Sequence, residues 1–202
     1  MLSDREGHAS HLEILEMIHA VEPISKVLEY GCGRYSTPWF VENCDYVRSV
    51  ELAQKWLDIA AEQIVVKKAI WKPEACSTEY DSLLEVCKEK WSVALIDGAR
   101  YYDRHAVAQC LISTGAVRTV ICHDAERCEY LWNTIALPNQ YYALRIEGAQ
   151  PWTLIISTDD RWLSVFGKKY RCSLYRNTEE FLHMSYPAIL SFEEQQRLKN
   201  GK

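Results

Sequence analysis

The sequence lacks the features that mark membrane and secreted proteins. Its 202 residues contain no apolar run near the roughly 20 residues that a membrane-spanning helix needs. The opening stretch, MLSDREGHAS, has no apolar segment of the kind found in a signal peptide. The eight cysteines are scattered and include no C-x-x-C pair, which argues against a disulfide framework and against a zinc site. We therefore expect free thiols and a cytoplasmic protein.

Basic stretches are missing as well. The net charge is −5 and no long stripe of Lys and Arg occurs, which argues against a nucleic-acid partner. Hydrophobic residues make up 48% and charged residues 25% of the chain, as in an ordinary folded protein. At this length we expect a single domain over 1–202, with an N-terminal helix over 1–24 and a C-terminal extension over 160–202.

Helical and strand-like patterns alternate along most of the chain. Strands are predicted over 26–31, 45–52, 65–71, 91–98, 116–124, 141–148 and 152–158, with a further edge strand over 162–167. Helices are predicted over 37–44, 53–64, 78–90, 103–114, 129–136 and 191–200. Strands separated by helices form parallel βαβ units. The pattern therefore predicts an α/β fold with a doubly wound, mostly parallel seven-stranded sheet and an antiparallel edge strand.

The stretch VLEYGCGRYST, residues 27–37, runs from the first predicted strand into a glycine turn. In a doubly wound sheet the ligand lies outside the carboxyl ends of the strands, and the first strand supplies the glycine loop. Gly31 and Gly33 let the backbone turn tightly and approach a ligand. A dinucleotide fingerprint would need a third glycine where Ser36 stands, and Glu29 would repel a phosphate. An acid at this place suits a cationic ligand better.

The segment Glu29-Tyr30-Gly31-Cys32-Gly33 resembles motif I of the class I S-adenosylmethionine-dependent methyltransferases. This resemblance implies a Rossmann-like methyltransferase fold and S-adenosylmethionine as the cofactor, with its methionine part against the glycine loop. Glu51 ends the second strand about twenty residues later, where an acid can accept both ribose hydroxyls. VRSVEL, the segment around it, is similar to motif II of the same family. The expected cofactor-binding residues are Glu29, Gly31, Cys32, Gly33, Ser36, Thr37, Glu51, Asp97 and Gly98. Thr37 can also cap the helix that follows the loop.

Two later strands end in polar residues, Asp97-Gly98 and His123-Asp124. Both ends would face the crevice beside the glycine loop, where polar groups are costly to leave unpaired. With Arg100, Tyr102 and Arg127, these segments resemble the D-G-x-R-G-Y and H-D-x-x-R segments of the glucuronoxylan O-methyltransferase family. Tyr101 stands where that family has glycine, and Glu129 lies one residue early. The resemblance therefore implies methyl transfer more firmly than it implies a sugar substrate.

Methyl transfer to an oxygen needs a group that takes the proton of the acceptor. The candidates are two histidines, His123 and His105, and His123 is preferred because it ends a core strand. The arginines could bind a substrate carboxylate in a bidentate manner, or pair with the nearby carboxylates of Asp97, Asp124 and Glu126. The predicted catalytic residues are His123, Asp97, Asp124, Arg100 and Arg127.

A metal ion is a separate expectation. Asp97 and Asp124 occupy the strand ends that carry two aspartates in the catechol-type O-methyltransferases, which this part of the sequence resembles and in which magnesium holds the substrate. Two carboxylates with open water positions suit Mg²⁺ or Mn²⁺. Ala125 follows Asp124 where that family places asparagine, so the ligand set departs from the pattern.

Two other functions use the same sheet. One is an NAD-dependent oxidoreductase, against which Ser36 and Glu29 both count. The other is a non-catalytic binding module, against which the intact set of Glu29, Gly31, Gly33, Glu51 and Asp97 counts. The preferred interpretation is an S-adenosylmethionine-dependent methyltransferase that acts on the oxygen of a small polar molecule, with no membrane or nucleic-acid partner.

Overall fold

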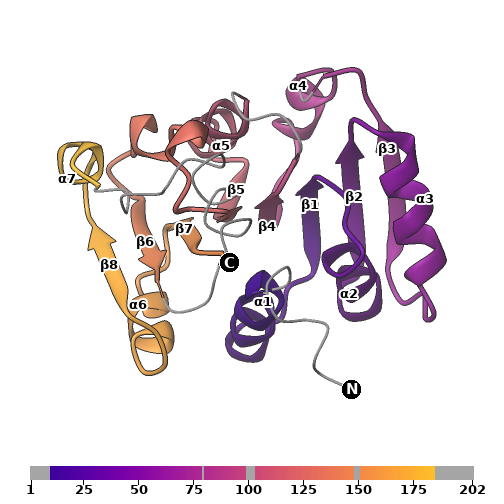
Figure 1. The fold of residues 1–202 in the computed structure, drawn as a ribbon, viewed down its shortest axis with the longest axis horizontal. Helices are drawn as coiled ribbons and strands as arrows, with labels where there is room; N and C mark the ends of the chain where they lie inside the picture. Colours follow the sequence, from indigo (N-terminus) through magenta and orange to yellow (C-terminus); the bar gives the residue numbers. More distant parts are fainter. Residues whose placement is uncertain (1–9, 79, 99–102, 148–150, 185–202) are drawn as a thin grey trace, which may run out of the picture.

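Eight strands form one sheet in the order β3-β2-β1-β4-β5-β7-β6-β8 (Figure 1). The computed structural model describes residues 10–78, 80–98, 103–147 and 151–184. The strands are β1 (Lys26–Tyr30), β2 (Tyr46–Glu51), β3 (Ile70–Ala75), β4 (Trp91–Ile96), β5 (Val117–His123), β6 (Tyr142–Ile146), β7 (Thr153–Ser157) and β8 (Cys172–Tyr175). β1 to β5 are parallel, whereas β7 is antiparallel to β5 and β6, and β8 is antiparallel to β6. Strand order reverses between β1 and β4, so a ligand is expected at their carboxyl ends.

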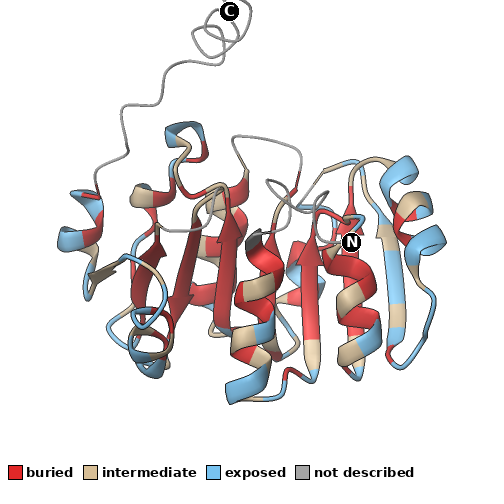
Figure 2. Ribbon diagram, turned by 60° about the horizontal axis from the view of Figure 1, so that its bottom comes forward, coloured by how far each residue is buried: buried red, intermediate tan, exposed pale blue. Residues whose placement is uncertain are grey.

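Helices cover both faces of this sheet. One face carries α1 (Ser10–Val21), α2 (Ser36–Asn43) and α6 (Arg161–Phe166), and α3 (Gln54–Gln63) contacts α2. The other face carries α4 (Leu83–Val86), α5 (Arg104–Ser113), α7 (Thr178–Leu182) and the short 3-10 helices η1 (Cys128–Tyr130) and η2 (Trp132–Thr134). The central strands are buried, while β3 at the sheet edge is largely exposed (Figure 2).

Side chains alternate along each strand, and this places the polar strand ends on one face. The residues Val27, Val47, Val93 and Ile121 pack in the same cluster as the apolar residues of α1 and α2. Side chains two or four positions further along a strand point to the same face. These are the side chains of Glu29, Ser49, Glu51, Asp97 and His123. The α1/α2 face of the carboxyl edge is therefore where the polar strand ends gather.

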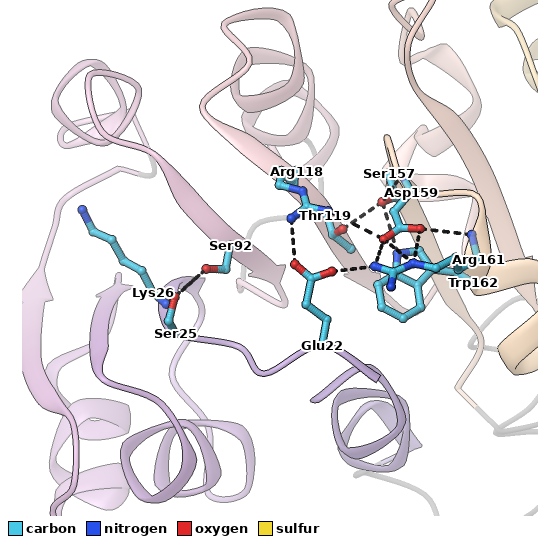
Figure 3. Close-up of polar contacts among 10 residues, drawn as sticks. All are labelled: Glu22, Ser25, Lys26, Ser92, Arg118, Thr119, Ser157, Asp159, Arg161 and Trp162. Atoms are coloured by element: carbon cyan, nitrogen blue, oxygen red, sulfur yellow. Dashed lines mark hydrogen bonds and ion pairs between the residues drawn. The ribbon is translucent and has the colours of Figure 1, made fainter. Parts of the chain in front are cut away.

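At the opposite, amino edge, ion pairs join the helices of this face to the sheet (Figure 3). Glu22, just after α1, accepts hydrogen bonds from Arg118 of β5 at 2.7 Å and from Arg161 of α6 at 2.6 Å. Arg161 also pairs with Asp159. Because these arginines are half exposed, we assign the network a role in aligning α1, β5 and α6 rather than a large contribution to stability.

The predicted fold class is confirmed, but the sheet has eight strands rather than seven. The segment 162–167 is not an edge strand, because helix α6 covers it and the backbone N–H of Arg161 donates to the Asp159 side chain at 3.1 Å. The additional strand, β8, comes ten residues later and extends the antiparallel end of the sheet. The predicted C-terminal extension thus contributes α6, β8 and α7 over 160–184.

Three other local predictions differ from the structure. The helix expected over 78–90 contracts to α4, because the Asp81 carboxylate accepts the backbone N–H groups of Ser77 and Thr78 and forms a turn. The helix expected over 129–136 is broken into η1 and η2 at Leu131, whose φ is 53°. The third strand begins at Ile70, after an exposed segment, rather than at 65. The helix expected over 191–200 lies outside the described residues. No helix in the described part of the chain is long and apolar enough to cross a membrane.

Candidate functional site

The glycine turn after β1 lies directly against the end of β4. Gly31 has a φ of +93°, and a Cβ at this position would lie 2.5 Å from the carbonyl of Asp97 and from the nitrogen of Gly98. The backbone N–H of Gly31 donates to Val50 at 2.9 Å, and that of Asp97 donates to Tyr30 at 2.7 Å. The positive φ and the close approach both require glycine here. This contact holds the ends of β1, β2 and β4 together.

Glu29 is a fully buried carboxylate beneath the glycine loop. Its Oε2 accepts hydrogen bonds from the hydroxyls of Thr37 at 2.8 Å and Ser49 at 2.7 Å. The Thr37 hydroxyl in turn accepts the backbone N–H of Gly33 at 3.0 Å. Thr37 therefore does not cap α2, which begins at Ser36; its hydroxyl is used to link Glu29 to the loop. Glu29 itself is not among the residues that line the cleft.

Burial raises the pKa of Glu29 to about 7. The hydroxyl hydrogen bonds lower this pKa, and the negative charge of Asp97 adds to the effect of burial. Oε1 has no hydrogen-bond partner among the described residues. A carboxyl group in this position therefore keeps its proton to a higher pH than an exposed glutamate does.

Glu51 fastens the other side of the loop. Its Oε2 accepts the backbone N–H of Cys32 at 2.8 Å, and its Oε1 accepts the backbone N–H of Ala53 at 2.9 Å. The side chain is only slightly exposed, in the wall of the cleft. Each carboxylate oxygen has two lone-pair positions, so both can accept a further hydrogen bond from a ligand.

A cleft of ≈ 540 Å³ opens between the glycine loop, the end of β2 and the end of β4. It is lined by Cys32, Gly33, Arg34, Tyr35, Glu51, Trp56 and Asp97. Four of these were expected from the sequence, whereas Arg34, Tyr35 and Trp56 were not. Trp56 lies five residues after Glu51, near the start of an amphipathic helix, and its unusual exposure for a tryptophan is visible only in the structure.

Beyond Asp97, charged residues from β4, β5 and α5 meet at the edge of the sheet. His123 Nδ1 lies 3.1 Å from Asp97 Oδ1 and 3.6 Å from Asp124 Oδ1. Arg104 Nη1 lies 3.3 Å from Asp97 Oδ1 and 3.6 Å from Asp124 Oδ2. Arg104, missed in the sequence, also donates from Nε to the Gly98 carbonyl at 2.5 Å. The guanidinium of Arg104, the first residue of α5, thus links the predicted strand ends at Asp97 and Asp124.

The charges in this group shift its pKa values in opposite directions. Burial alone would raise the pKa of Asp97, but the charge and hydrogen bond of His123, with Arg104 and His11, lower it to about 2. Burial alone would lower the pKa of His123, and the two carboxylates raise it above its usual value. Asp97 is therefore ionised at neutral pH, and the two carboxylates make the neutral His123 ring a stronger base.

Of the predicted arginines, Arg127 lies at the margin of this group. Its side chain is 41% exposed, and its Nε lies 3.9 Å from Asp124 Oδ2. Asp124 has a φ of 58°, which is unusual outside glycine and turns the chain sharply at the end of β5. Arg100 lies outside the described residues. His105, in the first turn of α5, is half buried and does not belong to the group.

His11 of α1 completes the group; in the sequence it stands one helical turn from His8 without a second ligand pair, so a metal role is not expected there, and its contact with the end of β5 appears only in the structure. Its ring is 3% exposed and packs edge-on against the ring of His123, with centroids 4.7 Å apart and planes at 81°. Burial lowers the pKa of His11 to about 4, with a further contribution from the charge of His123. His11 is therefore neutral at physiological pH.

A magnesium or manganese ion between Asp97 and Asp124 does not fit these residues. The cationic Arg104 already lies within 3.6 Å of both carboxylates. Ala125, where an amide ligand would be needed, is fully buried and apolar. Mg²⁺ and Mn²⁺ bind through oxygen ligands and depend on the negative charge of carboxylates. Here Arg104 already compensates the charge of both carboxylates.

Comparison with known proteins finds similarity in the fold. No protein-family model matches the chain. No curated protein sequence matches it either. Among solved structures, an O-methyltransferase from Bacillus cereus in complex with SAH is similar over 76% of this chain and 83% of its own, with 13% identity and a TM-score of 0.58.

A second solved structure gives the same result. The O-methyltransferase TomG from Streptomyces achromogenes, in complex with SAM, covers 75% of this chain and 81% of its own, with 13% identity and a TM-score of 0.56. At these identities the likeness concerns the fold alone. The Rossmann-like methyltransferase fold implied by the sequence is confirmed, and the glucuronoxylan-type detail stays a prediction.

The Gly31 turn gives a test of the contact between β1 and β4. Gly31→Ala should lower the free energy of unfolding by more than the roughly 1–2 kcal/mol that positive φ costs an L-residue, because the new Cβ also meets backbone atoms. The matched control is Gly115→Ala, which also has a positive φ, +61°, but whose new Cβ would only reach ordinary contact, 3.9 Å from Lys90 Nζ. Urea unfolding of both variants measures the difference. Equal losses would contradict the close approach at Gly31.

The buried Glu29 gives a pH-dependent test. Its pKa of about 7 in the folded state exceeds the ordinary value of about 4.3, so the folded protein binds this proton more tightly than the unfolded chain. The free energy of unfolding contributed by this group therefore falls as the pH rises from about 4.5 to about 7. Glu29→Gln cannot titrate and should lack this fall.

Urea unfolding across this pH range measures the effect. Glu42→Gln, an exposed change on α2, is the control and should keep the wild-type slope. A Glu29→Gln variant with that same slope would show that the carboxyl titrates normally.

Proposed function

We propose that the chain is an S-adenosylmethionine-dependent methyltransferase. The observation that carries the proposal is Glu51, a carboxylate in the wall of a cleft beside the tight Gly31 turn, at the switch point of the sheet. The fold is shared with O-methyltransferases whose structures hold SAM or SAH. An acid at the end of the second strand binds ribose hydroxyls in nucleotide-binding sheets of this kind.

The proposed cofactor site follows the loop. The backbone of Gly31, Cys32 and Gly33 borders the methionine part, and Glu51 accepts the ribose hydroxyls. Asp97 and Gly98 border the loop from the end of β4, and Trp56 offers an aromatic face in the same cleft. Glu29, with Ser36 and Thr37, acts indirectly, because it is buried under the loop and fixes its position through the Thr37 hydroxyl.

The proposed reaction is O-methylation of a small polar molecule at the neighbouring group of charged residues. A lone pair of the acceptor oxygen forms the new C–O bond while the C–S bond breaks and its electron pair remains on sulfur. The acceptor proton passes to neutral His123, whose Nε2 has no partner among the described residues. Asp97 orients the His123 ring through Nδ1. The ion pair between Asp124 and Arg104 holds the neighbouring end of β5 in place.

The remaining assignments concern the surroundings of the reaction. We propose that Arg127 and Arg100 contact the acceptor from the rim, since the Arg127 side chain is 41% exposed beside Asp124. A net charge of −5 favours a small acceptor over nucleic acid. All eight cysteines are free thiols, which supports a reducing, cytoplasmic setting.

Cofactor binding is the first test. Titration with S-adenosylhomocysteine in a calorimeter should give micromolar affinity, and Glu51→Ala should weaken it by roughly 1–3 kcal/mol because the ribose hydroxyls lose their acceptor. Glu42→Ala is the control and should bind as the wild type does. Thermal melting of each variant separates lost binding from lost fold.

The same titration decides between cofactors. Heat with NADH and none with S-adenosylhomocysteine would assign the chain to the oxidoreductases. No heat with either ligand would leave a binding module.

Turnover is the second test. His123→Ala should lower the turnover number by about 10²–10⁴-fold if this residue takes the acceptor proton, with little change in cofactor affinity. The control is His183→Ala, at an exposed histidine that follows α7. Radiolabelled methyl donor is offered with sugars, uronates, catechols and hydroxy acids, and with RNA and peptide pools. Label in RNA or peptide alone would refute the small-molecule acceptor, and a fully active His123→Ala would remove that residue from the reaction.

A further inference from the structure

Three metal-ligating side chains from three elements converge beside the cleft, which one of them, Asp97, also lines. They are His11 from α1, Asp97 after β4 and His123 at the end of β5. Each offers one ligand atom, and these three atoms lie within 4.8 Å of one another. We propose that His11, Asp97 and His123 bind a divalent transition-metal ion of the zinc class.

The geometry is close to that of a bound ion. Ligand atoms about 2.1 Å from a common ion lie about 3–3.5 Å apart in tetrahedral or square arrangements. His123 Nδ1 and Asp97 Oδ1 already have this spacing, at 3.1 Å. Separations within the group reach up to 4.8 Å, so the widest pair must close by up to about 1.3–1.8 Å, through rotation of the His11 ring.

The ring nitrogens of His11 give an independent reason. Both are buried and have no hydrogen-bond partner within the described ranges, whereas Nδ1 of His123 already faces Asp97. Buried polar atoms without partners cost free energy, and native structures retain them mainly where a ligand, an ion or water binds. At 3% and 6% exposure, neither histidine turns its ring to solvent instead.

The donor set selects the class of ion. Two imidazoles and one carboxylate suit zinc, iron, cobalt or nickel, whereas magnesium prefers oxygen ligands. Arg104 opposes any cation here, at 3.3 Å from Asp97. That repulsion removes the advantage of magnesium, whose binding depends on carboxylate charge, but imidazole nitrogens form strong bonds to softer ions without a charge of their own. Binding also removes the proton that His123 otherwise shares with Asp97.

Three protein ligands leave at least one coordination position of the ion without a protein ligand. Asp97 lines the cleft and its side chain is 28% exposed, so a molecule in the cleft can reach that position. An ion with an open position can bind the acceptor oxygen and lower its pKa. This chemical role rests on the proposed function, whereas binding of the ion does not. In the loaded protein His123 is a ligand, and the ion takes over activation of the acceptor.

Cobalt is the probe for the test. The full chain is stripped with chelator, dialysed and titrated with Co²⁺, whose visible absorption bands report nitrogen and oxygen coordination. We expect saturation at one ion per chain, no displacement by excess Mg²⁺, and displacement by Zn²⁺. His11→Phe keeps the ring volume in its buried position but removes both nitrogens, and should weaken Co²⁺ binding at least tenfold.

One control locates the site. His183→Ala, at an exposed histidine outside the three ligands, should keep Co²⁺ binding. Each variant is checked by thermal melting and by calorimetry with S-adenosylhomocysteine. A wild-type chain that binds the cofactor product but no Co²⁺ would overturn the metal site and leave the proposed function standing. Full Co²⁺ binding by a folded His11→Phe variant, or its loss in His183→Ala, would also overturn it.

Discussion

The close contact between the Gly31 turn and the end of β4 is the constraint on which the site depends. Backbone atoms occupy the space where a Cβ of residue 31 would lie, so the two strand ends cannot separate without breaking the turn. The loop that follows is then held from both sides, by Glu51 at the Cys32 N–H and by Thr37 at the Gly33 N–H. A cleft with fixed walls results, and fixed walls reduce the ordering that a bound ligand would otherwise require.

Charge compensation governs the neighbouring end of the site. Asp97 and Asp124 lie close enough to repel one another, and both face Arg104 and His123. Arg104 contributes beyond its charge, because its guanidinium lies 4.2 Å from the centre of the Tyr130 ring and holds the Gly98 carbonyl. Buried charges of this kind persist only when paired, so the group behaves as one unit rather than as independent residues. Removing one member is expected to disturb the others.

The sequence was a good guide where periodicity or a strand end carried the information. Apolar strands that end in polar residues are visible in a single chain, which is why Glu51, Asp97 and His123 could be placed at one edge. Side-chain alternation then assigns them to a common face. The short edge strand β8 and the six-residue helix α6 carry too few residues for a periodic pattern, and their identity depends on pairing with β6 and on the Asp159 turn.

Other parts of the site depend on contacts that no local pattern encodes. His11 lies more than a hundred positions before His123, and only the packing of α1 against the sheet brings the rings together. Arg104 begins a helix and gives no sign of reaching back to the preceding strand end. Glu29 differs in the other direction, because its position in the motif suggests contact with a ligand. Its complete burial instead makes it a support of the glycine loop. The sequence identifies the edge of the sheet; burial decides which side chains there face a ligand.

Helix α1 links the two ends of the molecule and so bears on how the site can change. Its far end is tied to β5 and α6 through Glu22, while its near end places His11 against His123. Both attachments involve β5, whose last residue is His123, so the helix and the strand move together if they move at all. The network at Glu22 thus helps to align the helix that carries His11, from its opposite end. The contacts of α1 through Glu22 and His11 share no residue with the hydrogen bonds of Glu29 and Glu51 that hold the glycine loop.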